Sequence, residues 1–232
     1  DKIFIVGVYL IKGVAPSKCK DNALCMLNDL INKYNIPKNE RGNNLIFHRT
    51  ELKKHNSQLS KNITNRIFDY IYKHDAKFVY LCDNNTDNIY STKYYYINFV
   101  ALLVVKTLNE IIKQNKYLDN KIILNVVCAS RLDITYSGKI PHKQHIEDKE
   151  INAGIMENIE ELKIKYGLLN ENFSINLSCE IATVNHALVI ADYFCNTFFA
   201  YKSENIIDIE IFESIPKENI LFEIPYNTFD ND

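Results

Sequence analysis

The sequence of 232 residues lacks several features that would assign it to a common class. It has no tryptophan, six glycines and five prolines, and neither Gly-x-Gly-x-x-Gly nor Gly-x-x-x-x-Gly-Lys-Ser/Thr occurs. A nucleotide enzyme built on a glycine-rich phosphate loop is therefore poorly supported. The longest apolar run, residues 94–105, is interrupted by Asn98 and is too short to span a bilayer. With no signal peptide visible, we predict no membrane association.

The chain also lacks an excess of positive charge. Lysine and arginine together number 27 against 29 acidic residues, which gives a formal net charge of −2. Autonomous nucleic-acid binding is usually driven by a basic surface that neutralises phosphates. Any nucleic acid bound here would need a local basic strip, or a partner chain that supplies one.

Paired cysteine motifs are missing as well, because no Cys-x-x-Cys occurs and the spacings fit no zinc-ligand pattern. Several cysteines lie within apolar runs, as expected for buried, reduced thiols. We therefore expect a cytoplasmic protein whose cysteines do not form disulfides. The six are Cys19, Cys25, Cys82, Cys128, Cys179 and Cys195.

Hydrophobic residues make up 47% of the chain, with 12% aromatic, enough to form a substantial core. The periodicity predicts alternating strands and helices, so we expect an α/β fold whose mixed sheet is flanked by helices. Asp21 is expected to cap the first helix, and residues 131–149 are expected to leave the regular pattern as an excursion. The expected strands are 3–11, a short one within 43–52, 77–83, 121–129 and 173–181, and the expected helices are 21–36, 62–75, 93–116, 151–167 and 185–202.

Three acids stand where predicted elements begin or end, or in an apolar setting. Glu51 follows the short strand, Asp83 ends the strand 77–83, and Asp192 is the only formal charge of 185–202 before its final lysine. An unpaired buried carboxylate is costly, so Asp192 must be paired, protonated, solvent-facing or bound to a metal. Acids from different elements can converge at the strand ends of an α/β sheet and bind Mg²⁺ there.

Three stretches, in order, resemble the ribonuclease H-like proteins grouped as "domain of unknown function 3800". "FIVGVYLI" (4–11) is similar to the second strand of that family. "FHRTEL" (47–52) resembles its His-x-x-Glu-Leu stretch, and "NHALVIADYFCNTFFAYK" (185–202) resembles its closing helix with an Ala-Asp pair. The resemblance spans roughly residues 3–202, and its last stretch is the most specific. It implies a ribonuclease H-like domain over 1–205 and a C-terminal extension over 206–232.

The resemblance also implies a metal site. Glu51 and Asp192 match two family acids, Asp83 is placed by element order, and these three would bind Mg²⁺ or Mn²⁺. His48 would act as a proton carrier or would support the metal ligands. The Asp-Glu-Ser that opens the first strand of the family is absent, so we expect an upstream segment. Because 3–11 has the composition of a buried strand, we also expect a strand beside it on each edge.

Each candidate has a structural alternative. Glu51 can be an exposed acid favoured by a helix N-terminus, and Asp83 can be a turn residue. Asp133 competes as a third acid or is a solvated loop residue, and His48 can be a buried, hydrogen-bonded histidine. Asn196, at i+4 from Asp192, can lie beside it on the same helix face.

Two further groups are open to more than one interpretation. Lys139 and the loop "PHKQH" (141–145) can contact phosphates or be solvated. Tyrosines 94–96 can stack on bases, or they can belong to the core because an apolar helix follows them.

Two function classes follow. The first is a metal-dependent nuclease, or nuclease-fold subunit, that acts on DNA or RNA, with antiviral defence as the context associated with the family. The second is a catalytically inactive ribonuclease H-like module that binds or regulates partners in a larger complex. Either class can involve a protein partner or a homo-oligomer. Sequence alone does not separate DNA from RNA, or endonuclease from exonuclease action.

Overall fold

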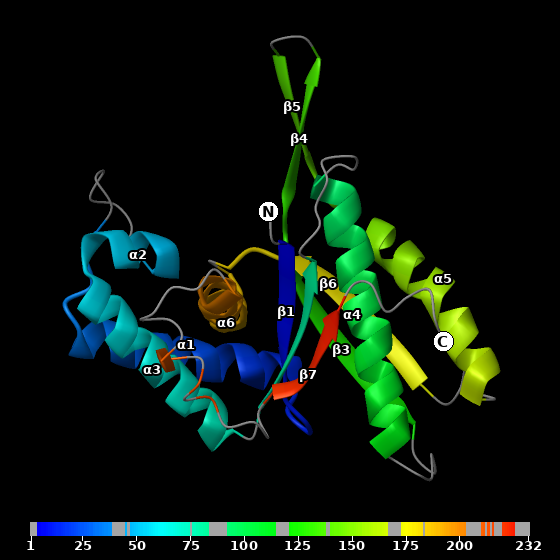
Figure 1. Ribbon diagram of the computed structural model, residues 1–232, viewed down its shortest axis with the longest axis horizontal. Helices are drawn as coiled ribbons and strands as arrows, with labels where there is room; N and C mark the ends of the chain where they lie inside the picture. Colours follow the sequence, from blue (N-terminus) through cyan, green and yellow to red (C-terminus); the bar gives the residue numbers. More distant parts are fainter. Residues whose placement is uncertain are drawn as a thin grey trace. The chain divides into compact units, whose positions relative to one another are not determined.

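The chain has a mixed α/β architecture, shown as a computed structural model in Figure 1. Its elements divide into two compact units. The discontinuous unit combines residues 3–83 with 182–232, and the middle unit comprises residues 84–181. The predicted boundary at residue 205 stays a prediction. The structure describes residues 4–38, 45, 47–74, 76–83, 92–114, 121–137, 140–166, 173–182, 184–202, 210–211, 213, 215 and 220–225.

The discontinuous unit contains a three-stranded sheet in the order β1-β2-β7. Strand β1 (Phe4–Leu10) runs antiparallel to β2 (Lys77–Asp83), and β2 runs parallel to β7 (Ile220–Pro225). Strand β1 thus has a neighbour on one edge. Among the described residues no strand pairs with its other edge, so the expected second neighbour stays a prediction.

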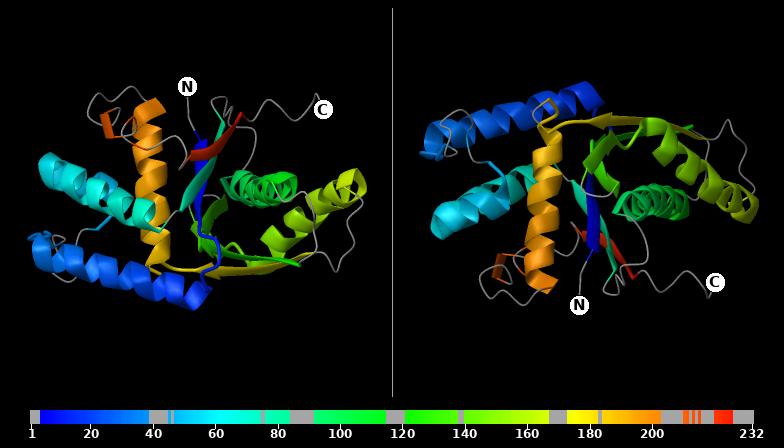
Figure 2. Two further views of the ribbon diagram at one scale, coloured as in Figure 1. Left: turned by 90° about the horizontal axis from the view of Figure 1, so that it is seen from below. Right: turned by 90° about the horizontal axis from the view of Figure 1, so that it is seen from above.

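Four helices of this unit lie on one side of the sheet (Figure 2): α1 (Pro16–Lys33), α2 (Arg49–His55), α3 (Ser57–Lys73) and α6 (Ala187–Lys202). In both views of Figure 2, α6 lies beside β1 and β2, with α1 and α3 beyond it. Aromatic rings form the contact with the sheet. Phe194 of α6 stacks on Phe78 of β2 with ring centroids 3.7 Å apart, and Phe198 lies against Tyr80 at the same separation.

The middle unit has a parallel pair of strands, β3 (Ile122–Ala129) and β6 (Phe173–Glu180). Helices α4 (Thr92–Gln114) and α5 (Asp148–Tyr166) cover one face of this pair (Figure 2). The two helices approach closely at Gly154, where an added Cβ would lie 3.2 Å from the Cβ of Ala101. Tyr96 is buried and donates a hydrogen bond to the carbonyl oxygen of Ala129 at 2.7 Å, which favours the core interpretation for this tyrosine.

Two local expectations from the sequence are wrong. Helix α1 begins at Pro16, with Ala15 as its N-cap, so Asp21 lies inside the helix and does not cap it. The expected excursion over 131–149 instead contains a β-hairpin of β4 (Leu132–Ser137) and β5 (Ile140–His145), followed by the start of α5. The short strand expected within 43–52 is reduced, in the described part, to a single bridge between Lys38 and Leu45. None of the helices described is long and apolar enough to cross a membrane.

Candidate functional site

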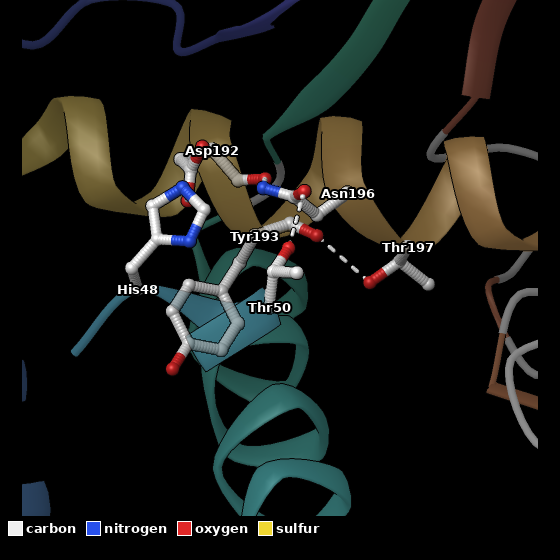
Figure 3. A network of polar contacts seen from close by, with 6 residues as sticks. All are labelled: His48, Thr50, Asp192, Tyr193, Asn196 and Thr197. Carbon is white, nitrogen blue, oxygen red and sulfur yellow. Dashed lines mark hydrogen bonds and ion pairs between the residues drawn. The ribbon is translucent and has the colours of Figure 1, made fainter. Parts of the chain in front are cut away.

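The candidate site lies in the discontinuous unit, where the start of α2 meets the middle of α6 (Figure 3). The apolar residues of helix α6 cover most of its circumference. Ile190, Tyr193 and Phe194 are fully buried. Asp192 stands between them in sequence, yet one third of its side chain is exposed. The carboxylate of Asp192 is therefore not enclosed in the core.

His48 provides the partner of Asp192. Its Nε2 lies 3.5 Å from Oδ2 of Asp192, and half of the His48 side chain is exposed. His48 occupies the N-cap position of α2, but its side chain accepts no hydrogen bond from the α2 backbone. Instead, the imidazole turns towards α6 (Figure 3). Of the four possibilities for Asp192, the structure shows a carboxylate that is paired with a histidine and partly open to solvent.

A second contact joins the same two helices one turn further along α6. The hydroxyl of Thr50 donates a hydrogen bond to Oδ1 of Asn196 at 3.1 Å. The amide nitrogen of Asn196 donates in turn to the backbone carbonyl of Asp192 at 2.9 Å. The Asn196 amide is thus oriented on both sides, and the two interhelical contacts fix α2 against α6 (Figure 3).

Buried side chains hold α2 in this place. Leu52 is fully buried, and Arg49 is 4% exposed. The Nε of Arg49 donates to the Thr64 hydroxyl at 3.3 Å, and that hydroxyl donates to the carbonyl of Ser60 at 2.7 Å. Arg49 and Leu52, three positions apart, are buried on one face of α2, whereas Thr50 and Glu51 between them are exposed.

Tyr193 of α6 lies next to His48 and Thr50 at the contact between α2 and α6 (Figure 3). Its ring meets that of Phe47 edge-on, with centroids 6.4 Å apart. Its hydroxyl is buried and has no hydrogen-bond partner among the described residues. Burial raises the pKa of Tyr193, with an opposing effect from Arg49 and a further rise from Asp192. Tyr193 therefore stays a neutral phenol at physiological pH, and its hydroxyl is a buried group that sequence reasoning missed.

The structure brings some of the predicted residues together and leaves others open. Glu51 is exposed in the first turn of α2, three positions after His48, and so follows it by about one helical turn. Asp83 is the last residue of β2, and Asp133 is the second residue of β4. The side chains of Asp83 and Asp133 lie outside the description, as do those of residues 139 and 141–144.

The donors at the α2–α6 contact are of the type that hard cations prefer. Asp192 and Glu51 supply carboxylate oxygens that reach solvent. In the part of the chain that the structure describes, no three His, Cys, Asp or Glu side chains form a group able to hold a metal ion. Mg²⁺ commonly keeps several waters and binds through one or two carboxylates plus substrate phosphates. The carboxylate chemistry of Asp192 and Glu51 is compatible with such a water-rich Mg²⁺ site, and the described residues contain no fully protein-ligated one.

Asp192 was the detectable signal in the sequence, because it is a lone charge in an apolar helix. The partnership of Thr50 with Asn196 had no such signal, since it joins residues far apart in the chain. No family model, curated protein or solved structure matches the chain.

Proposed function

We propose that the chain is a ribonuclease H-like, metal-dependent nuclease, or the nuclease-fold subunit of a larger assembly, that hydrolyses phosphodiesters of DNA or RNA in the cytoplasm. The observation that carries the proposal is the pairing of His48 with Asp192 at a solvent-reached contact of two helices. An acid and a titratable base from distant parts of the chain meet there, and Glu51 follows one turn along α2. The mixed α/β fold is compatible with the ribonuclease H-like class.

Each residue has a role in this proposal. Glu51 and Asp192 would hold Mg²⁺ or Mn²⁺, with Asp83 as a further ligand from the end of β2. The metal, when bound, would offset negative charge at the phosphodiester. His48 presents its Nε2 to Asp192, and an imidazole nitrogen can carry a proton there. The exposure of His48 lets this proton exchange with water or substrate.

A second candidate is a catalytically inactive module of the same fold that binds a partner. The His48–Asp192 pair also supports this second candidate, because a histidine that pairs with Asp192 can balance the carboxylate without a metal. In this case His48 and Asp192 would act as a surface ion pair that fixes α2. The two candidates differ in what happens when Asp192 loses its charge.

The decisive experiment replaces Asp192 with asparagine, which removes the charge and nearly keeps the shape. The purified chain is assayed on single-stranded DNA, duplex DNA and RNA, with Mg²⁺, Mn²⁺ or a chelator. Asp192→Asn and Glu51→Gln should each lower metal-dependent cleavage by about 100-fold or more, since charge at the phosphoryl centre dominates this chemistry. Asp69→Asn is the matched control, because it removes an exposed acid of α3 whose ion pair with Arg66 lies on the surface.

Thermal melting separates the candidates further. A half-exposed ion pair contributes only about 0–1 kcal/mol, so Asp192→Asn should change the free energy of unfolding little. If Asp192 holds a metal, Mg²⁺ should raise the melting temperature of the wild type and not that of the variant. Absence of metal-dependent cleavage on all three substrates, with melting insensitive to Mg²⁺ in both proteins, would refute the nuclease and leave the binding module.

A further inference from the structure

Two cysteines of the middle unit lie side by side in its parallel sheet. The register of β3 and β6 pairs Cys128 directly with Cys179. Residues opposite one another on neighbouring parallel strands point to the same face, because both strands follow the same pleat. Both thiols are free. No local pattern indicates this pair, since 50 residues separate its members and neither belongs to a Cys-x-x-Cys motif.

The spacing of the two residues suits a disulfide. Neighbouring strands lie about 4.7–4.9 Å apart, and the Cα atoms of bonded cysteines usually lie about 4.4–6.8 Å apart. The Cys128 thiol is also close enough to that of Cys179 to raise the pKa of Cys179. A small local approach of the two strands is therefore enough to bring the sulfur atoms within bonding distance.

The two thiols differ in their access to solvent. Cys128 is 6% exposed, whereas Cys179 is half-buried. Asp148, in the first turn of α5, accepts a hydrogen bond from the backbone nitrogen of Cys179 at 3.1 Å and also contacts its thiol. A reagent from solution therefore meets Cys179 first, and Cys128 is the thiol that lies behind it.

We propose that Cys128 and Cys179 form a reversible, intramolecular disulfide when the chain meets a small-molecule disulfide such as oxidised glutathione. The thiolate of Cys179 attacks one sulfur of oxidised glutathione, which releases one glutathione thiolate and leaves a mixed disulfide on Cys179. The thiolate of Cys128 then attacks the Cys179 sulfur and releases the second glutathione. Two electrons pass to the oxidant, and the two protons from the cysteine thiols end on the two glutathione molecules formed.

The environment predicts a slow reaction at neutral pH. The neighbouring Cys128 thiol, burial and the Asp148 carboxylate all raise the pKa of the Cys179 thiol. The thiolate is the attacking species. As long as the pH is below that pKa, the thiolate fraction, and with it the initial rate, should increase about tenfold for each unit by which the pH rises. The pair is thus suited to sustained oxidising conditions and not to a rapid signal.

The disulfide should also be easily reduced. The mean Cβ separation in disulfides is about 3.8 Å, which is shorter than the spacing of strands in a sheet. Strands β3 and β6 would have to draw together locally, and strained disulfides are the more reducible ones. The crosslink closes the loop that runs through β4, β5 and α5, so it should restrain the whole middle unit.

Peptide mapping of the folded wild-type chain tests the proposal. The protein is incubated with oxidised glutathione at neutral and at mildly alkaline pH, alkylated, digested and analysed by mass spectrometry. We expect one linked pair of peptides that contain Cys128 and Cys179, with a rate that rises with pH, and full reversal by reduced glutathione. The crosslinked protein should melt several degrees above the reduced protein.

Matched variants define the specificity. Cys179→Ser and Cys128→Ser should each abolish the linked peptide, whereas Cys25→Ser, which changes an exposed cysteine of α1, should leave it intact. The mapping of the wild type decides the question even if a variant fails to fold. A mixed disulfide that persists on Cys179, linkage to any other cysteine, or unreacted Cys128 and Cys179 after prolonged alkaline incubation would overturn the proposal.

Discussion

Replacing Gly7 with alanine tests how closely α6 approaches the sheet of the discontinuous unit. Gly7 lies in the middle of β1, beneath the helix that carries Asp192. An added Cβ would lie 2.8 Å from Sγ of Cys195 and 3.4 Å from a ring carbon of Phe194. Side-chain carbons essentially never come as close to a neighbour as 2.8 Å, so the helix or the Cys195 side chain must move.

The size of the effect follows from two opposing contributions. Overpacking by one methyl group in a packed contact costs about 1–3 kcal/mol. Replacement of glycine by alanine also restricts the unfolded chain, which stabilises by about 0.4–1 kcal/mol. Because the contact with Sγ is so short and Phe194 is fully buried, we expect the steric cost to exceed the gain. Gly7→Ala should lower the free energy of unfolding by about 1–2 kcal/mol.

A double-mutant cycle with Cys195→Ala identifies the cause. Cys195→Ala removes the sulfur that the new methyl group would meet, so the double variant should recover most of the loss, with a coupling energy of about 1 kcal/mol or more. Urea unfolding, followed by the circular dichroism of the helices, measures all four proteins. Gly154→Ala is the control, because its Cβ would lie 3.2 Å from Ala101 in the middle unit and has no contact with Cys195. A neutral or stabilising Gly7→Ala, or a cycle without coupling, would show that α6 does not pack on β1 as described.

Two other predictions concern the α2–α6 contact and the phenols of the discontinuous unit. Thr50→Val and Asn196→Ala should each lower the free energy of unfolding in urea by about 0.5–1.5 kcal/mol. The double variant should lose less than the sum, because both changes remove the same hydrogen bond. Strict additivity would contradict that bond. Burial raises the pKa of Tyr72 and Tyr193 from 10.0, and it raises the pKa of Tyr70 to about 12. Above pH 10 the unfolded chain therefore releases phenol protons that the folded chain retains, and the free energy of unfolding should fall as the pH rises. Tyr193→Phe should make this fall shallower and, because the hydroxyl has no hydrogen-bond partner among the described residues, should be neutral or stabilising at pH 7; an unchanged alkaline slope would contradict the buried phenol.

Most regular elements could be predicted from local patterns. The strand over 77–83 agrees with β2 at both ends, and those over 121–129 and 173–181 agree with β3 and β6 within a residue. Their composition is β-branched and aromatic, and polar residues flank them, so local sequence is sufficient. Helix α1 begins earlier than predicted because Pro16 occupies a first-turn position, where its missing N–H costs nothing.

The hairpin of β4 and β5 shows where local patterns fail. Lys139, Pro141 and the histidines of 141–145 interrupt any apolar alternation, so the segment lacked the usual signature of strands. Its strands pair from Leu132 with His145 to Ser137 with Ile140. This pairing between the two strands is not visible in the composition of the segment.

The sequence was enough to single out Asp192, but it was not enough to predict which residues surround Asp192 in the fold. The sequence identified Asp192 because its charge conflicts with its surroundings, and it offered Asn196 as a neighbour on the same helix. The approach of His48 and Thr50 to α6 depends on tertiary packing, since 143 residues separate His48 from Asp192. The convergence of Glu51 and Asp192 on one metal stays a prediction.

The use of a histidine at the start of α2 is itself informative. Helix α2 has seven residues, and helices shorter than about 12–15 residues are marginal alone in water. Its N-cap position favours Ser, Thr, Asp or Asn, whose side chains would contribute about 1 kcal/mol by accepting a backbone hydrogen bond. His48 makes no such bond and contacts Asp192 instead. Helix α2 therefore lacks the stabilisation of an N-cap hydrogen bond, and the buried side chains of Arg49 and Leu52 hold it in place instead. Locally suboptimal residues that are supported by buried neighbours are typical of functional positions, and this is the physical reason to test His48 and Asp192 first.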